Sequence, residues 1–456
     1  MGEHIQERLK NKIERVGVRD EETVVSHGVG ECLCCGLLAK QSKVLRDGFL
    51  FTIRQCDVCA FQSEAFDKKH DEFALYKSSL ANTHITGRVG EPISEKSFSN
   101  LDMHAVVLHV NATCNTPCKI CFYPDLLPQQ DITITAVRNG LKRFTNQQKT
   151  VCVFGGEPTI HPKIMHIVKE VKASGNTPEL FTNGIKLADM NFLDALIDAG
   201  LERVNITVDS FDKEPYERLR SGAWEWKLRL KGLENLGKRN IITKINATIA
   251  KGINDHSVSE LMDYINEHAY VTELRALALN PTTGALGLEY VPSITELISY
   301  MPCFSVEHFT EFRTFQENIQ RINHALGFRK PYNTGDAPTL LAKRTSNGLR
   351  PLFSVEELRA YNRAMENLND AAAMTHAIRA FKKNKRFAYA RILLGSRFNP
   401  CVIERKLQAL GIVKITTCAF TTRLNKDGRS DMKVISLLAD PKNKDDMIIR
   451  VGTVPS

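Results

Sequence analysis

Three cysteines stand close together in the segment NATCNTPCKICFYP, residues 111–124. Cys114, Cys118 and Cys121 have C-x3-C-x2-C spacing, with Pro117 between the first two. A closed structural zinc site takes four ligands, and iron–sulfur clusters are normally held by four cysteines. Three thiolates would hold a cluster and keep one iron open for another ligand. The alternative interpretation is a trio of buried, inert cysteines.

A second set of cysteines lies near the N-terminus. Cys32-x2-Cys35 and Cys56-x2-Cys59 form two pairs separated by 20 residues, a spacing that predicts a tetrahedral four-sulfur metal site. Zinc is the usual structural ion, and a rubredoxin-like mononuclear iron would use the same four thiolates. Cys34 is a spare or alternative ligand.

Three further cysteines, Cys303, Cys401 and Cys418, are widely spaced. They either join an auxiliary iron–sulfur cluster, if the fold gathers them, or pack as small buried hydrophobic residues. Disulfides are not expected, because residues 1–25 are charged and polar and form no secretory signal. No stretch approaches the ~20 apolar residues that cross a bilayer, so we expect a cytoplasmic protein.

The composition is that of an ordinary globular enzyme. The chain has 456 residues, of which 43% are hydrophobic and 25% charged. Its formal net charge of +9 is compatible with a nucleic-acid partner. We favour a surface that serves solubility or an anionic small substrate, because charge alone does not define a site.

From residue 105 onward, short apolar runs alternate with segments of helical spacing. Strands are predicted at 105–110, 150–154, 179–183, 203–209, 243–250 and 273–281, and helices at 136–144, 163–174, 191–201, 227–240 and 257–268. This series of six units implies an α/β fold of parallel strands with helices outside, in a partial barrel or an open doubly wound sheet. In both, ligands lie beyond the carboxyl ends of the strands.

Special residues lie at or just after the carboxyl ends of the first four of these strands. They are Cys114, Gly155, Gly156, Glu157, Thr182, Asn183, Asp209 and Ser210. Because the carboxyl ends of parallel strands meet at one edge of a sheet, we expect these residues to converge on one mouth.

The sequence divides into four segments. We predict a four-cysteine metal-binding domain at 1–75, a polar linker at 76–104, the barrel at 105–285, and a helix-rich region at 286–456 that covers the substrate or holds an auxiliary cluster. The run GFLFTIR at 48–54 predicts a strand in the first segment. Strand-like runs at 415–420 and 433–439 lie in the last.

The three-cysteine loop and the motifs after it resemble the radical S-adenosylmethionine (radical SAM) superfamily over residues 105–285. The matching segments are FGGEPTI at 154–160, FTNG at 181–184, NITVDSF at 205–211 and INATIAKGINDH at 245–256. The resemblance implies a partial (β/α)6 barrel and an enzyme of the transferase or oxidoreductase type.

By this resemblance, Cys114, Cys118 and Cys121 bind three irons of a [4Fe–4S] cluster. S-adenosylmethionine chelates the fourth iron, so the missing ligand is the cosubstrate. A reductant such as flavodoxin or ferredoxin supplies an electron, and the 5′-deoxyadenosyl radical that forms abstracts hydrogen from the substrate.

The resemblance also implies roles for other residues. Gly155 and Gly156 leave room for backbone to approach the methionine moiety, and Glu157 holds its ammonium group by a charge-assisted hydrogen bond. Phe122 and Tyr123 either frame the adenine or pack in the core. Four polar residues either touch the ribose or cap a helix or turn. These four are Thr182, Asn183, Thr207 and Asp209.

The N-terminal layout LCCGLLAK…FTIRQCDVC…FDKKHDEFALYK more loosely resembles a branch that includes archaeal tetraether lipid synthases and pterin-methylating enzymes. It implies a lipid-like, pterin or natural-product substrate and formation of a carbon–carbon or carbon–heteroatom bond. Two alternatives stay open. One is a radical enzyme that modifies RNA or peptide, and the other is a non-catalytic zinc-knuckle binding protein.

Overall fold

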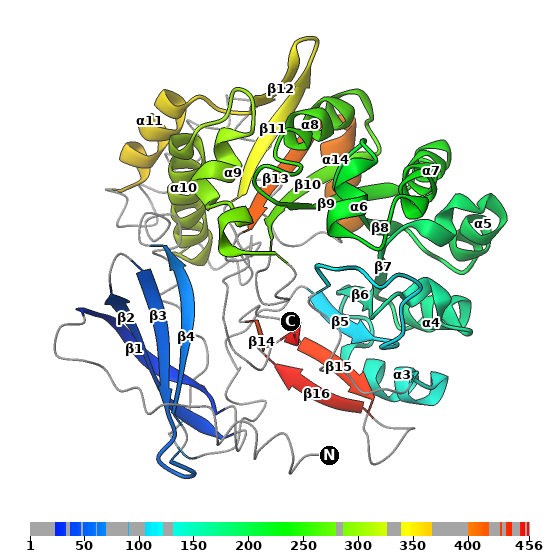
Figure 1. The fold of residues 1–456 in the computed structure, drawn as a ribbon, viewed down its shortest axis with the longest axis horizontal. Helices are drawn as coiled ribbons and strands as arrows, with labels where there is room; N and C mark the ends of the chain where they lie inside the picture. The colour runs from blue at the N-terminus through cyan, green and yellow to red at the C-terminus, as the bar shows by residue number, and fades with distance from the viewer. Residues whose placement is uncertain are drawn as a thin grey trace. The chain divides into compact units, whose positions relative to one another are not determined.

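A computed structural model of the chain (Figure 1) describes residues 23–32, 37–46, 49–60, 62–69, 90, 105–121, 131–279, 286–325, 339–366, 400–418, 429–430, 435–439, 447–451 and 454–455. The chain forms two compact units. The first comprises residues 1–102, 420–431 and 455–456, and the second comprises residues 103–419 and 432–454. Apart from Gly90, the predicted linker at 76–104 lies outside the described residues.

The first unit contains a four-stranded antiparallel sheet in the order β1-β2-β3-β4. Its strands are β1 (Thr23–Glu31), β2 (Leu38–Arg46), β3 (Phe49–Gln55) and β4 (Gln62–Lys69). Strand β3 is the predicted strand at 48–54. The apolar side chains of Leu38, Val44 and Ile53 are buried and stabilise the sheet. A further two-stranded sheet is formed by β14 (Arg429–Ser430), which belongs to this unit, and β17 (Val454–Pro455).

The second unit is built on an 11-stranded sheet in the order β12-β11-β13-β10-β9-β8-β7-β6-β5-β15-β16. Its central strands run parallel. They are β5 (Ala105–His109), β6 (Thr150–Phe154), β7 (Thr177–Thr182), β8 (Arg203–Thr207), β9 (Ile242–Ile249) and β10 (Val271–Ala278). These six strands confirm the predicted series of β–α units.

Helices connect these strands and lie along the outer side of the curved sheet (Figure 1). They are α3 (Ile134–Leu141), η3 (Lys142–Phe144), η4 (Pro158–Ile160), α4 (Ile164–Ala173), η5 (Ile185–Ala188), α5 (Met190–Asp198), α6 (Glu214–Leu219), α7 (Trp224–Lys238) and α8 (Ser257–Glu267). Helix α4 buries Ile164, Ile167, Val168 and Val171, the apolar stripe that its sequence spacing predicts.

The C-terminal part of the chain extends both edges of the sheet. At one edge lie β11 (Thr339–Thr345), β12 (Gly348–Pro351) and β13 (Ile412–Cys418), and at the other β15 (Ile435–Ala439) and β16 (Met447–Val451). Strand β13 pairs parallel with β10, and β15 pairs parallel with β5. The region 286–456 therefore supplies strands as well as helices, because the open edges of a six-stranded partial barrel expose unpaired backbone groups that further strands satisfy.

The remaining helices of this region are η7 (Leu288–Tyr290), α9 (Ile294–Ser299), α10 (Val306–Ala325), α11 (Val355–Glu366) and α14 (Pro400–Ala409). A capping box of Ser293 and Glu296 starts α9. Aromatic contacts join Phe315 of α10 to Tyr361 of α11. Among the described residues, none of the helices has the length and apolar character needed to cross a membrane.

The two faces of the parallel strands differ in chemistry. Residues such as Val204, Ile206 and Ile245 point toward the helices and are buried and apolar. The opposite face, called the inner face below, carries many polar and charged residues beside apolar ones such as Phe181 and Ile242. The polar and charged residues are Glu179, Arg203, Asn205, Thr207, Lys244, Asn246, Glu273, Arg275, Lys414 and Thr416. Parallel strands are usually apolar on both faces, so this departure indicates a functional interior.

Candidate active site

The cysteine loop leaves β5 and crosses over the end of β6. The Gly156 amide donates to the Asn111 carbonyl at 3.0 Å, and the Glu157 amide donates to the Thr113 carbonyl at 2.8 Å. The Asn111 side chain donates back to the Glu157 carbonyl at 3.0 Å. Further along, the Ile120 amide donates to the Leu219 carbonyl at the end of α6. These contacts hold the loop in one place before any ligand binds.

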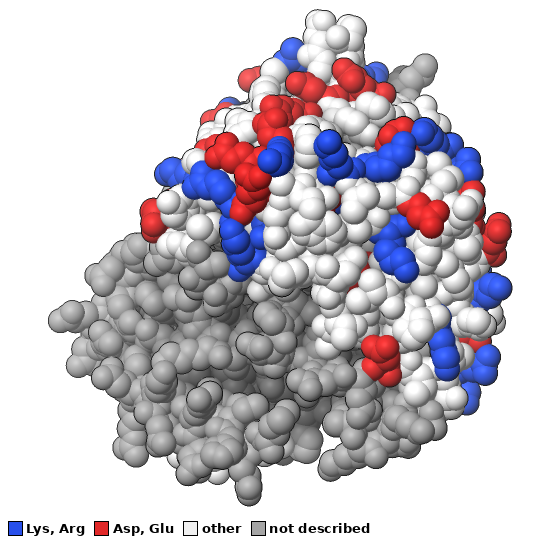
Figure 2. Space-filling model, turned by 45° about the vertical axis from the view of Figure 1, so that its right-hand side comes forward, with Lys and Arg blue, Asp and Glu red and all other residues white. Residues whose placement is uncertain are grey.

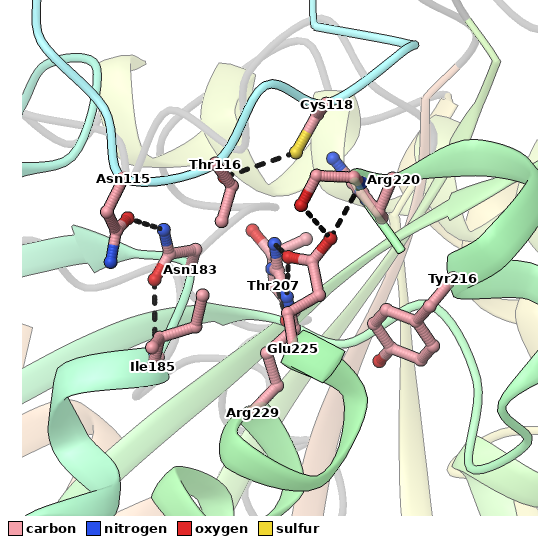
Figure 3. A network of polar contacts seen from close by, with 12 residues as sticks. Asn115, Thr116, Cys118, Asn183, Ile185, Thr207, Tyr216, Arg220, Glu225 and Arg229 are labelled. Atoms are coloured by element: carbon pink, nitrogen blue, oxygen red, sulfur yellow. Dashed lines mark hydrogen bonds and ion pairs between the residues drawn. The ribbon is translucent and has the colours of Figure 1, made fainter. Parts of the chain in front are cut away.

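The three predicted cluster ligands lie on this loop. Cys114 is exposed, Cys118 and Cys121 are half-buried, and none is in a disulfide. The Thr116 hydroxyl lies 3.4 Å from the Cys114 sulfur and 3.3 Å from the Cys118 sulfur, so these two sulfurs lie close together. Figure 3 shows the contact between Thr116 and Cys118. A four-iron cluster takes each thiolate on a different iron, and reachable thiols on one loop fit that arrangement.

Gly155 and Gly156 are required by the cysteine loop itself. A Cβ atom at Gly155 would collide with Asn111, and one at Gly156 would collide with the carbonyl oxygens of Ala112 and Thr113. The glycines therefore let two backbone segments pass in contact. The predicted reason, space beside the methionine moiety, remains a prediction.

Glu157 is buried, and its carboxylate is held by four donors. Oε1 accepts from the Thr159 amide (3.0 Å), the Thr159 hydroxyl (2.6 Å) and the Thr182 hydroxyl (2.7 Å). Oε2 accepts from the Asn183 amide at 2.7 Å. Oε1 is thus crowded with three donors, whereas Oε2 accepts one hydrogen bond and keeps capacity for another donor.

Asn183 links the end of β7 to the cysteine loop. Its Nδ2 donates to Asn115 Oδ1 at 2.7 Å, and its Oδ1 accepts from the Ile185 amide at 3.0 Å (Figure 3). The Thr182 hydroxyl also accepts from the Gly184 amide at 3.0 Å. Thr182 and Asn183 thus position Glu157 and the loop, and the ribose contact remains a prediction.

Asp209 is fully buried and binds Arg220, a residue that the sequence analysis did not single out. The Arg220 Nε donates to Asp209 Oδ2 at 2.6 Å, and Nη2 donates to Oδ1 at 2.8 Å. Oδ1 also accepts from the Thr248 amide at 2.9 Å. Burial works to lower the pKa of Arg220, but the Asp209 carboxylate outweighs it and raises that pKa.

Arg220 places a fixed positive charge near the cluster loop. Its guanidinium interacts electrostatically with Cys118, and Figure 3 shows the two side chains on the same side of the strand ends. The Tyr216 hydroxyl supports this arrangement by accepting from the Asp209 amide and donating to the Ser210 carbonyl. A buried aspartate needs a cation nearby. Asp209 was therefore the one feature of the sequence that could have indicated a basic partner.

The end of β8 is held by a second buried ion pair. Arg229 Nε donates to Glu225 Oε2 at 2.9 Å, and its Nη1 donates to the Thr207 carbonyl at 3.4 Å. Thr207 lies half-buried on the inner face (Figure 3). Two predicted adenine-framing residues, Phe122 and Tyr123, lie outside the described residues.

In the first unit, three of the predicted metal ligands come together. The sulfur atoms of Cys32, Cys56 and Cys59 lie within 4.8 Å of one another, and Cys32 packs with Cys56 in a buried cluster. The fourth predicted ligand, Cys35, lies outside the described residues, as does Cys34. Three converging thiols fit a tetrahedral zinc or iron ion.

The Cys56→Ala variant is expected to lose about one metal ion per chain, because a tetrahedral site deprived of one thiolate binds far more weakly. Elemental analysis of zinc and iron on the purified full chain measures this. Cys152→Ala is the matched control, since Cys152 lies on β6 and is expected to retain the full metal content. An unchanged metal count in Cys56→Ala would contradict the assignment.

The three scattered cysteines fall on different elements of the second unit. Cys303 precedes α10 and its sulfur contacts Arg350, Cys401 lies in α14, and Cys418 ends β13. The auxiliary cluster that would use them remains a prediction.

The described surface carries mixed charge. Figure 2 shows lysines and arginines interspersed with aspartates and glutamates on one face, without a continuous basic patch among the residues described there. Exposed pairs such as Lys231–Glu234 and Arg239–Asp194 account for part of this mixing. On this face, the described residues have the charge distribution of a solvated surface.

Comparisons with known proteins agree on one domain. Residues 109–265 match the model of the radical SAM superfamily. A probable GTP 3′,8-cyclase of Thermococcus kodakarensis is 28% identical over 191 residues, 41% of this chain and 58% of that protein. A 7,8-dihydro-6-hydroxymethylpterin dimethyltransferase of Methanocaldococcus jannaschii is 25% identical over 226 residues, 47% of this chain and 44% of that protein.

Among solved structures, Streptococcus suis SuiB bound to precursor peptide SuiA aligns with 60% of this chain and 71% of that chain, at 14% identity and a TM-score of 0.36. The chain spans about half the length of the relatives it matches by sequence. The name of the superfamily that the model describes refers to radical chemistry with S-adenosylmethionine.

Proposed function

We propose that the protein is an enzyme that abstracts hydrogen from a small substrate and forms a carbon–carbon or carbon–heteroatom bond, because residues 109–265 match the model of the radical SAM superfamily. The observation that carries this proposal is the three-thiol loop held over the Gly-Gly-Glu turn by backbone hydrogen bonds. A barrel domain without catalytic activity would not need accessible thiols at the strand ends.

The described residues fit the cluster and its cosubstrate. Cys114, Cys118 and Cys121 would hold three irons and leave the fourth for S-adenosylmethionine. Glu157 Oε2 keeps acceptor capacity for an ammonium group, and Arg220 offers a buried cation for a carboxylate. When bound, the pair supplies a 5′-deoxyadenosyl radical, while the protein orients it and excludes water.

We propose a small heterocycle as the substrate. The names of relatives refer to GTP and to a pterin, which supports a purine- or pterin-like molecule over RNA, peptide or lipid. A transferase reaction fits the second of these relatives.

The decisive assay is anaerobic formation of 5′-deoxyadenosine by the reconstituted, reduced full chain with S-adenosylmethionine. We expect Cys118→Ala to lose activity by about a thousandfold and to lose most of its cluster iron, because two thiolates hold a cluster poorly. Cys152→Ala is expected to retain both. Equal 5′-deoxyadenosine formation by Cys118→Ala would refute the proposed function.

A further inference from the structure

One end of the inner face of the barrel is lined by a network of charged residues, called the floor below. At the amino-terminal ends of the strands, Glu179 contacts Arg203 at 3.2 Å and Lys244 at 3.0 Å. Glu273 contacts Arg275 at 2.9 Å and Lys414 at 3.2 Å, while Glu404 of α14 contacts Arg203 at 2.6 Å. Among the described residues of this network, four cations face three carboxylates, an excess of one positive charge. The four are Arg203, Lys244, Arg275 and Lys414.

Two asparagines lie on the same face, on neighbouring strands above this floor. Asn205 is two residues after Arg203 on β8, and Asn246 is two residues after Lys244 on β9. Asn205 is 1% exposed, and within the described structure neither its Oδ1 nor its Nδ2 has a hydrogen-bond partner. The Oδ1 of Asn246 is also unpaired there. A buried polar atom without a partner is destabilising, so the unpaired atoms of Asn205 and Asn246 need an explanation, and a ligand from outside the chain would supply one.

Arg275 completes the set from the next strand. It pairs with Asn246 in the β9–β10 register, and its Nε donates to Glu273 at 2.9 Å. Among the described residues, its two terminal nitrogens donate to no other group, and its side chain is 28% exposed. An arginine held by Nε with its outer edge open is arranged to bind a carboxylate or phosphate by two parallel hydrogen bonds.

We propose that Asn205, Asn246 and Arg275 bind the substrate of the proposed enzyme, and that this substrate is an anionic heterocycle with an amide edge. The inference rests on the proposed function. A carboxamide offers a donor and an acceptor side by side, which matches a lactam or aminopyrimidine edge. The Arg275 guanidinium, whose charge is the one in excess within the network, binds the acidic group.

Asn205, Asn246 and Arg275 lie where a bound substrate would be near the carboxyl ends of the strands. Asn205 lies two residues before Thr207, the last residue of β8, so roughly 7 Å of strand separates it from the strand end. A heterocycle bound at Asn205 therefore presents its other end to the cysteine loop. An alkyl chain in the same place would leave the amides and the guanidinium unpaired, which selects against lipid.

Direct binding to the reconstituted holoenzyme tests the proposal. The probes are 6-carboxypterin, followed by its fluorescence, and GTP as its competitor; each carries a lactam edge and an acidic group. We expect saturable binding of both, weakened about tenfold or more in Asn205→Leu and in Arg275→Met. Asn347→Leu, on an exposed turn, is the matched control and is expected to bind as the unaltered chain does.

A folding defect is excluded by a second measurement. Asn205→Leu removes two unpaired buried atoms, so its urea midpoint without probe is expected to equal or exceed that of the unaltered chain. A lower midpoint would indicate that Asn205 is satisfied inside the folded protein and would overturn the proposal.

Three binding results would also overturn it. These are no saturable binding of either probe, equal binding by Asn205→Leu and Arg275→Met, and displacement of 6-carboxypterin by palmitate but not by GTP. Formation of 5′-deoxyadenosine without any probe is measured separately. Its presence keeps the proposed function standing when the binding proposal fails, and its absence counts against the proposed function alone.

Discussion

Glu157→Gln is expected to abolish most cluster-dependent activity, although it only replaces one carboxylate oxygen by an NH2 group. All four groups around the carboxylate are donors, from Thr159, Thr182 and Asn183. A glutamine must turn its NH2 group toward at least one of them, which leaves a buried donor facing a donor. The loss of charge-assisted bonds and the unpaired donor together cost about 3 kcal/mol.

This defect reaches the cluster through Asn183. Its amide binds Glu157, and its side chain binds Asn115 in the cysteine loop. We therefore expect Glu157→Gln to lower 5′-deoxyadenosine formation by about a hundredfold, the equivalent of such an energy. The exposed Glu217→Gln is the control and should leave the rate unchanged. A full rate in Glu157→Gln would show that the buried carboxylate has no part in holding the site.

Lys244→Met is expected to destabilise the second unit strongly. Lys244 lies 3.0 Å from Glu179, 3.2 Å from Glu404 and 3.7 Å from Glu273. Its removal leaves buried carboxylates without a compensating charge, which costs about 3–5 kcal/mol. Urea unfolding followed by circular dichroism measures this. Lys231→Met removes an equivalent but exposed pair with Glu234 and should cost less than about 1 kcal/mol.

The loss of stability in Lys244→Met is expected to depend on pH. Burial alone would raise the pKa of Glu179, but Arg203, Lys244 and Arg275 outweigh it and lower that pKa from 4.5 to about 2. The stability it contributes is thus present above pH 4.5 and lost as the pH falls toward 2. Without Lys244 the carboxyl takes up a proton more easily, so the deficit of Lys244→Met should shrink between pH 7 and pH 4. A deficit that grows on acidification would contradict the network.

Local sequence patterns were sufficient to predict the helices and strands that position the site. The apolar stripe of α4 and the alternating strands and helices from β5 to β10 follow from residue periodicity, and the structure has them within a few residues. The convergence of Glu157, Thr182 and Asn183 follows from parallel strand ends. Contacts between neighbouring strands are thus encoded in short segments.

Contacts between distant segments were beyond such patterns. Arg220 is on no strand, and only the buried Asp209 indicates that a cation must approach. Strand β13 joins β10 although 133 residues separate Ala278 from Ile412, and periodicity does not report which edge a strand joins. The purpose of Gly155 was also hidden, because it depends on where the Asn111 backbone passes.

The central claim is that three cysteines leave one iron open for S-adenosylmethionine. Electron–nuclear double resonance of the reduced full chain tests it with S-adenosylmethionine carrying 15N in its amino group. We predict a hyperfine coupling between this nitrogen and the cluster, which is lost in Cys118→Ala together with the cluster signal. A cluster signal of full intensity without nitrogen coupling would mean that the fourth iron is already occupied, and would contradict the account.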